Sequence, residues 1–148
     1  MTGPSNFSLL LVDDDELDHE LMREALKKSG LPYAMQILSD GDVLLPYLLR
    51  EGPYANVPPV HLVLLDLNMP GRNGRDLLGE LKRDPRLRYL PVVLFTSSWA
   101  DADIASAYEL GANAVIIKPV TFAALIETLQ TLTRFWFQTA VLHPDLTA

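Results

Sequence analysis

Short apolar runs alternate with amphipathic segments along this chain of 148 residues, and that alternation limits the folds it can adopt. Apolar runs that end at turn-forming residues are typical of buried strands, and the segments between them carry apolar residues at helical spacing. Strands that alternate with helices predict an α/β domain, in which helices cover both faces of a parallel sheet. The predicted strands are 9–12, 33–38, 60–65, 91–95 and 114–117, and the predicted helices are 17–29, 42–50, 75–83, 101–110 and 121–137.

Glycine and proline residues set limits on these helices. Gly30 and Gly111 follow the ends of two of them, where glycine adopts a left-handed conformation at little cost. Pro46 lies inside the helix predicted at 42–50, and because proline has no backbone N–H, we expect it in the first turns or at a kink. With 49% hydrophobic residues, the chain is long enough for one domain with a proper core.

Polar side chains close four of the five apolar runs. Right-handed crossovers bring the carboxyl ends of parallel strands to one edge of the sheet, where ligands of such folds bind. We therefore expect three carboxylates, a hydroxyl and an ammonium group to meet at that edge. These groups belong to Asp13 and Asp14 after the first run, Asp66 after the third, Thr96 after the fourth and Lys118 after the fifth.

This set of groups suits phosphoryl chemistry. Clustered carboxylates repel one another, and a hard divalent cation such as Mg²⁺ relieves that repulsion through oxygen ligands. Asp66 is then a nucleophile towards a phosphoryl group, which would give an aspartyl phosphate. Lys118 supplies a second positive charge, and the Thr96 hydroxyl can donate to a phosphoryl oxygen. The backbone N–H groups of Asn68 and Ser97 are further candidate donors.

Each of these features also has an ordinary structural explanation. A single aspartate after a strand is usually a turn or N-cap residue, and residues 13–15 together could simply cap a helix. Thr96 and its neighbours could cap the next helix, and Lys118 could be a plain strand end. The joint occurrence of all these features at four strand ends favours the functional explanation.

The composition of the chain argues against several classes of function. A net charge of −7 argues against binding to nucleic acid through phosphate neutralisation. The chain has no cysteine, so it forms neither disulfides nor thiolate metal sites. No apolar stretch approaches the ~20 residues of a membrane span. Residues 1–7 do not resemble a signal peptide, and we expect a cytoplasmic protein that does not bind membranes.

From about Phe7 to Phe137, the chain resembles the receiver domain of two-component response regulators. In that family an acidic pair follows the first strand, a phosphoaccepting aspartate ends the third, a hydroxyl residue ends the fourth, and a Lys-Pro pair ends the fifth. The matching residues are Asp13 and Asp14, Asp66 within the segment 65–71, Thr96, and Lys118 with Pro119.

The resemblance implies a flavodoxin-like fold with five parallel strands in the order 2-1-3-4-5. It also implies that a histidine kinase phosphorylates Asp66 in a Mg²⁺-dependent reaction. The metal ligands would be Asp14, Asp66 and the Asn68 carbonyl, with Asp13 acting through water. A further implication is a cis peptide bond between Lys118 and Pro119.

One position departs from the family pattern. Many receivers carry a tyrosine or phenylalanine in the fifth strand that rotates together with the hydroxyl residue after phosphorylation. Val115 occupies that position here. We therefore expect the signal to travel through movements of loops and helices, or through an interface.

The resemblance divides the chain into a short tail (1–6), a receiver domain (7–137) and a C-terminal extension (138–148). The extension is too short for an output domain, so the output should be a contact with another protein. Apolar residues of the last helix form one inward face: Phe122, Leu125, Ile126, Leu129, Leu132 and Trp136. Others have no obvious place in the core: Phe135, Phe137, Val141 and Leu142.

Those remaining side chains either pack locally on the domain or form an interface. The Phe-Trp tail is similar to that of short receivers that partner phytochrome-type histidine kinases. We therefore expect such a kinase as partner and a homodimer through the last helix and its extension.

Two other functions compete with a phosphorylation switch. An aspartyl phosphatase usually needs an acid two residues after its nucleophile, and Asn68 at that position cannot supply a proton. A binding module that keeps the fold without using the site is the other alternative, although every site residue is present. The three histidines are expected to be exposed residues without a catalytic role.

Overall fold

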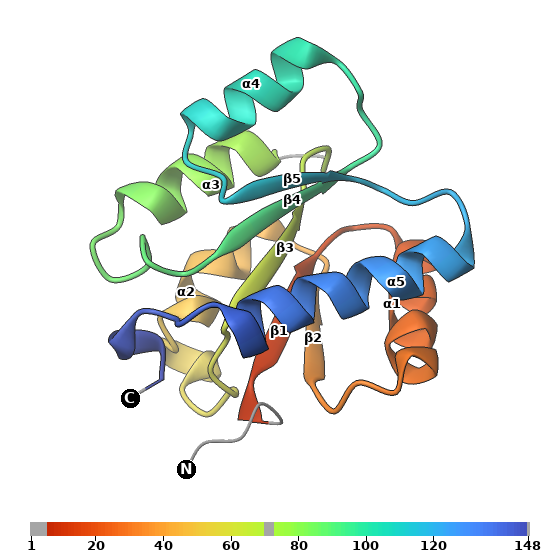
Figure 1. Ribbon diagram of the computed structural model, residues 1–148. Coiled ribbons are helices and arrows are strands. Elements are labelled where there is room, and N and C mark those ends of the chain that lie inside the picture. Colours follow the sequence, from red (N-terminus) through yellow and green to blue (C-terminus); the bar gives the residue numbers. More distant parts are fainter. Residues whose placement is uncertain (1–5, 70–72, 148) are drawn as a thin grey trace.

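Five parallel strands form one sheet at the centre of the computed structural model, which describes residues 6–69 and 73–147 (Figure 1). The strands are β1 (Ser8–Val12), β2 (Ala34–Leu38), β3 (Leu62–Asp66), β4 (Val92–Thr96) and β5 (Ala114–Ile117). Their order is β2-β1-β3-β4-β5, which confirms the predicted topology. β3 begins two residues later than predicted and includes Asp66 as its last residue.

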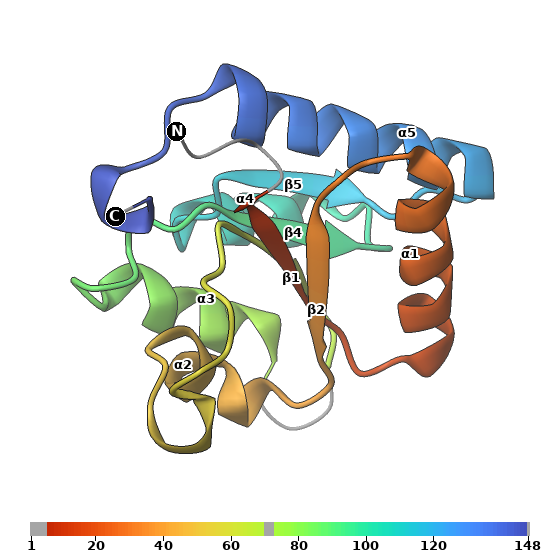
Figure 2. The ribbon, with the colours of Figure 1, turned by 90° about the horizontal axis from the view of Figure 1, so that it is seen from below.

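In the described part of the chain, five α-helices cover the sheet, two on one face and three on the other (Figure 2). The pair consists of α1 (Glu16–Ser29) and α5 (Phe122–Thr133), and the other three are α2 (Leu44–Leu48), α3 (Gly74–Arg83) and α4 (Asp101–Glu109). Short 3-10 turns at Gly41–Val43 and Gly52–Tyr54 flank α2. Within the described residues, none of the helices is long and apolar enough to cross a membrane.

Local signals in the sequence account for several helix ends. The Asp15 side chain caps α1 by accepting from the Leu17 N–H at 2.8 Å. Gly30 and Gly111 have φ values of 73° and 105°, so both adopt the predicted left-handed conformation. Pro46 is the third residue of α2, within its first turn as predicted, where proline breaks no helical hydrogen bond.

The sheet separates two apolar layers. Alternate residues of β1 point to opposite faces, so Leu10 and Val12 pack with α2, α3 and α4, whereas Leu9 and Leu11 pack with α1 and α5. β1 and β3 are fully buried because helices cover both of their faces. This rigid centre holds the strand ends in place.

The last helix continues beyond α5 as a π-helix over Arg134–Thr139. Phe137 is buried, with its ring 5.2 Å from that of Phe7 and 4.8 Å from that of Tyr33. Leu142 is buried as well, so the expectation that these two lack a place in the core was wrong. Phe137 lies four residues after the buried Thr133, so helical spacing keeps it on the inward face of the last helix.

Other predicted details differ from the structure. Phe122 is 37% exposed and is not among the α5 residues packed on the core, so its predicted place on the inward face was wrong. Among the described residues there is no cis peptide bond, so the Lys118–Pro119 bond is trans and the implied cis bond was wrong. Even before proline, the trans form is intrinsically favoured by about 0.5–1 kcal/mol. Residues 1–5 of the expected tail and Pro70-Gly71 of the β3 turn lie outside the described residues.

His61 and His19 are both buried, contrary to the expectation that the histidines are exposed. The Nδ1 atom of His61 accepts from the Ser8 N–H at 3.1 Å, and its ring also hydrogen-bonds the backbone of Leu146 in the C-terminal extension. Burial lowers the pKa of His61 below its ordinary value of 6.5, although the bond to Leu146 opposes this. The neutral ring therefore connects β1 to the extension.

Acid should break the hydrogen bond between Ser8 and His61, because a protonated Nδ1 cannot accept. A histidine with a depressed pKa binds fewer protons in the folded state, so its contribution to stability is present above pH 6.5 and is lost as the pH falls below that value. After correction for the intrinsic exchange rate, which itself falls with pH, the protection of the Ser8 amide should therefore decrease between pH 7 and pH 5. In a His61→Gln control, the protection of the Ser8 amide should not change over this pH range.

Candidate functional site

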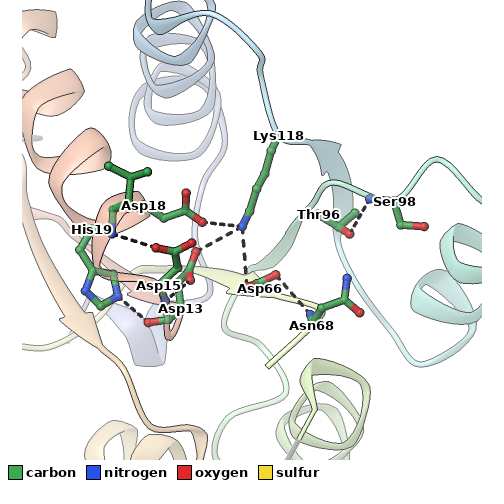
Figure 3. A network of polar contacts seen from close by, with 10 residues as sticks. Asp13, Asp15, Asp18, His19, Asp66, Asn68, Thr96, Ser98 and Lys118 are labelled. Carbon is green, nitrogen blue, oxygen red and sulfur yellow. Dashed lines mark hydrogen bonds and ion pairs between the residues drawn. The ribbon is translucent and has the colours of Figure 1, made fainter. Parts of the chain in front are cut away.

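The carboxyl ends of four strands converge on one polar cluster (Figure 3). Asp66 ends β3 and Thr96 ends β4, while Asp13 and Lys118 directly follow β1 and β5. Figure 3 shows the Lys118 side chain reaching from the β5 end towards the aspartates. The structure thus brings together the strand-end residues that the sequence singled out.

Lys118 connects the carboxylates of the cluster. Its Nζ donates to Asp18 Oδ2 at 2.8 Å and to Asp13 Oδ2 at 3.3 Å, and lies 3.7 Å from Asp66 Oδ2. Burial lowers the pKa of Lys118, but the bond to Asp18 and the charges of the three aspartates outweigh it, and the net pKa is raised. Lys118 therefore stays an ammonium ion.

Asp18 is a member of the site that the sequence reasoning missed. It lies in the first turn of α1, whose start is set by the Asp15 cap. Burial is the largest single effect on Asp18 and raises its pKa. The hydrogen bonds with Lys118 and Asp13 and the charge of Lys118 together outweigh burial, so the net pKa of Asp18 is lowered. The signal available in the sequence was its position within one helical turn of the acidic pair, which points a side chain back towards the strand ends.

Carboxylate oxygens of Asp13, Asp14 and Asp66 lie within 4.8 Å of one another. Asp13 and Asp66 are buried, whereas Asp14 is exposed and open to solvent. An all-oxygen cluster with one open side suits a hard divalent cation that keeps several water ligands. The residues present therefore fit the metal site predicted from the sequence.

Burial makes the two inner carboxylates costly to ionise. It raises the pKa of Asp13 to about 6, although the Asp15 N–H at 2.9 Å and Lys118 oppose the shift. It also raises the pKa of Asp66, against the effects of Lys118 and of the Asn68 N–H, which donates to Asp66 Oδ1 at 3.2 Å. A cation at the site would lower both values and return the carboxylates to the charged form.

Thr96 is buried at the end of β4, and its Oγ1 accepts from the Ser98 N–H at 3.0 Å. The Ser98 hydroxyl donates to Asp103 Oδ2 at 2.7 Å, and the other oxygen of Asp103 pairs with Arg75. This chain of contacts joins the β4 end to α4 and α3. Sequence reasoning did not identify it; it named Ser97, which is exposed beside Thr96.

Two further residues support the site from outside. His19 is buried and its Nε2 hydrogen-bonds the backbone oxygen of Asp13, which fixes the turn after β1. Val115, at the position where many receivers have an aromatic residue, donates its N–H to the Tyr108 hydroxyl at 3.2 Å. An aromatic residue therefore does contact β5, but it comes from α4.

The family profile described as the response regulator receiver domain matches residues 9–130. Response regulator Rcp1 from Synechocystis sp. is 37% identical over 134 residues, which cover 90% of this chain and 91% of that protein. The crystal structure of the phosphorylated cyanobacterial phytochrome response regulator RcpA has 38% identity and a TM-score of 0.83, with 92% and 97% of the two chains covered. The Mn²⁺-bound form of Rcp1 has 36% identity and a TM-score of 0.80, with 93% and 99% covered.

Proposed function

Because this chain belongs to the response regulator receiver family, we propose that it is a single-domain response regulator that takes a phosphoryl group from a histidine kinase on Asp66. The observation that carries the proposal is the position of Asp66: it is buried at a strand end beside two further aspartates, with the Lys118 ammonium 3.7 Å away. A nucleophile, a cation site and a fixed positive charge are what phosphoryl transfer requires.

Each residue has a defined part in this reaction. An Asp66 carboxylate oxygen attacks the phosphorus atom, and the bond from phosphorus to the kinase imidazole breaks as the new P–O bond forms. The Lys118 ammonium balances charge on the phosphoryl oxygens. The Thr96 hydroxyl and the backbone N–H groups of Asn68 and Ser97 donate hydrogen bonds to those oxygens.

We propose Mg²⁺ as the physiological cation. The Asp13, Asp14 and Asp66 carboxylates, together with the Asn68 carbonyl, would hold it, and Asp13 would act through water. When bound, the cation supplies positive charge at the phosphoryl oxygens. The oxygen-only donor set supports a hard cation, and the Mn²⁺-bound form of the relative Rcp1 is consistent with it.

The reaction modifies the protein itself, so we propose no separate substrate and no enzyme activity in the usual sense. The Asn68 side chain is an amide and cannot act as a general acid beside Asp66, which argues against a phosphatase. A cytoplasmic location is part of the proposal, because the ATP that charges a histidine kinase is there.

Intact mass measurement tests the proposed function. Incubation with acetyl phosphate and Mg²⁺ should add one phosphoryl group to the wild-type chain, and none without the metal. Asp66→Asn, which keeps the shape of the side chain, should show no adduct. If the wild type also shows none, titration with beryllofluoride separates rapid hydrolysis, in which the analogue binds, from an unused site, in which it does not bind and the proposal fails.

The partner and the assembly are further parts of the proposal. We propose a phytochrome-type kinase, because phytochrome response regulators are among the relatives of this chain.

We also propose a homodimer. The contact would be formed by α5 and by the extension at 138–148, which follows the receiver domain at 7–137. Exposed apolar side chains on that part of the surface support it: Phe135 is 50% exposed and Val141 is 97% exposed. An excess of acidic residues disfavours nucleic acid and anionic membranes as partners.

Replacing Phe135 and Val141 by serine should shift a dimer to monomer, since the double variant removes apolar area only from the proposed interface. Light scattering at micromolar concentrations, with and without phosphorylation, measures the mass. Val120→Ser is the matched control, because Val120 is fully exposed at the opposite end of α5 and should leave the dimer intact. A monomeric wild type in both states would end the dimer proposal.

A further inference from the structure

The nearest partner of the Lys118 ammonium is neither a strand-end residue nor a member of the carboxylate cluster proposed to hold the metal. It is Asp18 on α1, at 2.8 Å, compared with 3.3 Å for Asp13 and 3.7 Å for the proposed phosphoacceptor Asp66. In Figure 3 the Lys118 amino group lies between Asp18 and Asp66, with its shorter contact on the Asp18 side. A residue outside the proposed phosphoryl and metal sites thus holds the charge that the phosphoryl group would need.

A short hydrogen bond between an ammonium and a carboxylate is among the strong interactions of a folded protein, because both groups are charged. An ammonium ion has three donors; here it donates to Asp18 and Asp13, and Asp66 lies at ion-pair distance. When a phosphoryl group joins Asp66, its oxygens enter the same competition. The contact with Asp18 then has to lengthen or break for Lys118 to approach them.

We propose that Asp18 is a positioning residue that holds Lys118 back from Asp66 until a phosphoryl group arrives. This inference rests on the proposed function and adds a regulator of the same site. The Asp18 carboxylate acts in two ways in the same direction: it competes for the Lys118 donors, and its negative charge opposes an incoming anion. The site therefore binds phosphoryl oxygens less tightly than its other residues allow.

The effect should be moderate, because neither side chain of the pair is fully buried. Lys118 is 25% exposed and Asp18 is 29% exposed, so solvent screens part of their attraction. Changing Asp18 to asparagine keeps the size of the side chain and removes its charge. We expect roughly 1.5- to fivefold tighter binding of a phosphoryl analogue, the range for a partly screened ion pair.

The experiment compares Asp18→Asn with Asp15→Asn, which removes one negative charge from the same turn. The Asp15 side chain caps α1 through the Leu17 N–H, and asparagine caps a helix as well as aspartate does. Calorimetry measures the Kd of beryllofluoride at saturating Mg²⁺. Asp18→Asn should bind beryllofluoride more tightly than both the wild type and Asp15→Asn. A substitution that merely disturbs the fold of the site would weaken binding.

A crystal structure of metal-free Asp18→Asn provides a readout that does not depend on the analogue. The distance from Lys118 Nζ to Asp66 Oδ2 should fall below the 3.7 Å found here. Unchanged or weaker beryllofluoride binding, or equal tightening in Asp15→Asn, would overturn the proposal for Asp18. Failure of the proposed function is a separate outcome, in which the wild type itself binds no analogue and gains no phosphoryl group.

Discussion

Alanine at position 74 should unfold much of the protein or displace its nucleophile. A Cβ atom on Gly74 would lie 2.4 Å from the backbone oxygen of Asp66 and 2.8 Å from the Cα of Leu67. Both atoms belong to the backbone at the end of β3, so no side-chain rotation relieves the clash. We expect a loss of about 3 kcal/mol in the free energy of unfolding, the upper range for overpacking a tight contact.

The same change should impair phosphorylation even where the variant folds. Gly74 begins α3 and donates its N–H to the Leu67 oxygen at 3.1 Å, so α3 rests directly on the turn that follows Asp66. Moving α3 outwards shifts that turn, and shifts of about 1 Å are enough to slow a reaction that depends on positioning. Urea denaturation measures the stability, and intact mass after acetyl phosphate treatment measures the modification.

Gly79→Ala is the matched control, because it makes the same substitution in the same helix. Its Cβ would lie 2.8 Å from a guanidinium nitrogen of Arg83, the far end of a flexible side chain that can move aside. Alanine in a helix interior is favoured over glycine by roughly 0.5–1 kcal/mol. Gly79→Ala should therefore be neutral or stabilising; equal losses in both variants would refute the close contact at Gly74.

Burial of the Asp13 carboxylate should make its contribution to the stability of the metal-free protein smaller at neutral pH than in mild acid. The folded-state pKa of Asp13 is raised to about 6, compared with an ordinary value of 3.8. The folded state therefore binds more protons than the unfolded state between these values. Stability from this group is present below pH 3.8 and is lost as the pH rises towards 6, by up to roughly 3 kcal/mol.

Asp13→Asn isolates this contribution. The other titrating groups are the same in variant and wild type, so their pH dependence cancels in the difference between the two unfolding free energies. That difference should grow in favour of the variant from pH 4 to pH 7. Saturating Mg²⁺ at pH 7 should stabilise the wild type by about 2.7 kcal/mol at a hundredfold excess over the Kd, and Asp13→Asn by less. A difference that does not change with pH would show that Asp13 titrates normally in the folded state.

Several features of the site followed from residue order alone. Buried parallel strands read as short apolar runs, and right-handed crossovers bring all their carboxyl ends to one edge. The order of residues therefore predicted that Asp13, Asp66, Thr96 and Lys118 lie together, with strand limits within two residues of those observed. The ends of α1 and α4 at Gly30 and Gly111 could also be predicted, because they depend on the local backbone preference of glycine.

The order of residues did not predict which side chains of different helices and strands contact one another. The bond from Asp18 to Lys118 spans 100 positions in the sequence and depends on how α1 lies against the β5 end. The fit of Gly74 against β3 likewise depends on the distance between two packed backbones.

The sequence by itself determined which groups meet at the sheet edge, because strand periodicity and crossover handedness are local rules. Only the tertiary structure decided their partners, as with the buried ring of Phe137 and the ammonium of Lys118. Such choices are settled by packing among several elements at once, and differences of a few tenths of an ångström between competing contacts do not appear in the order of residues.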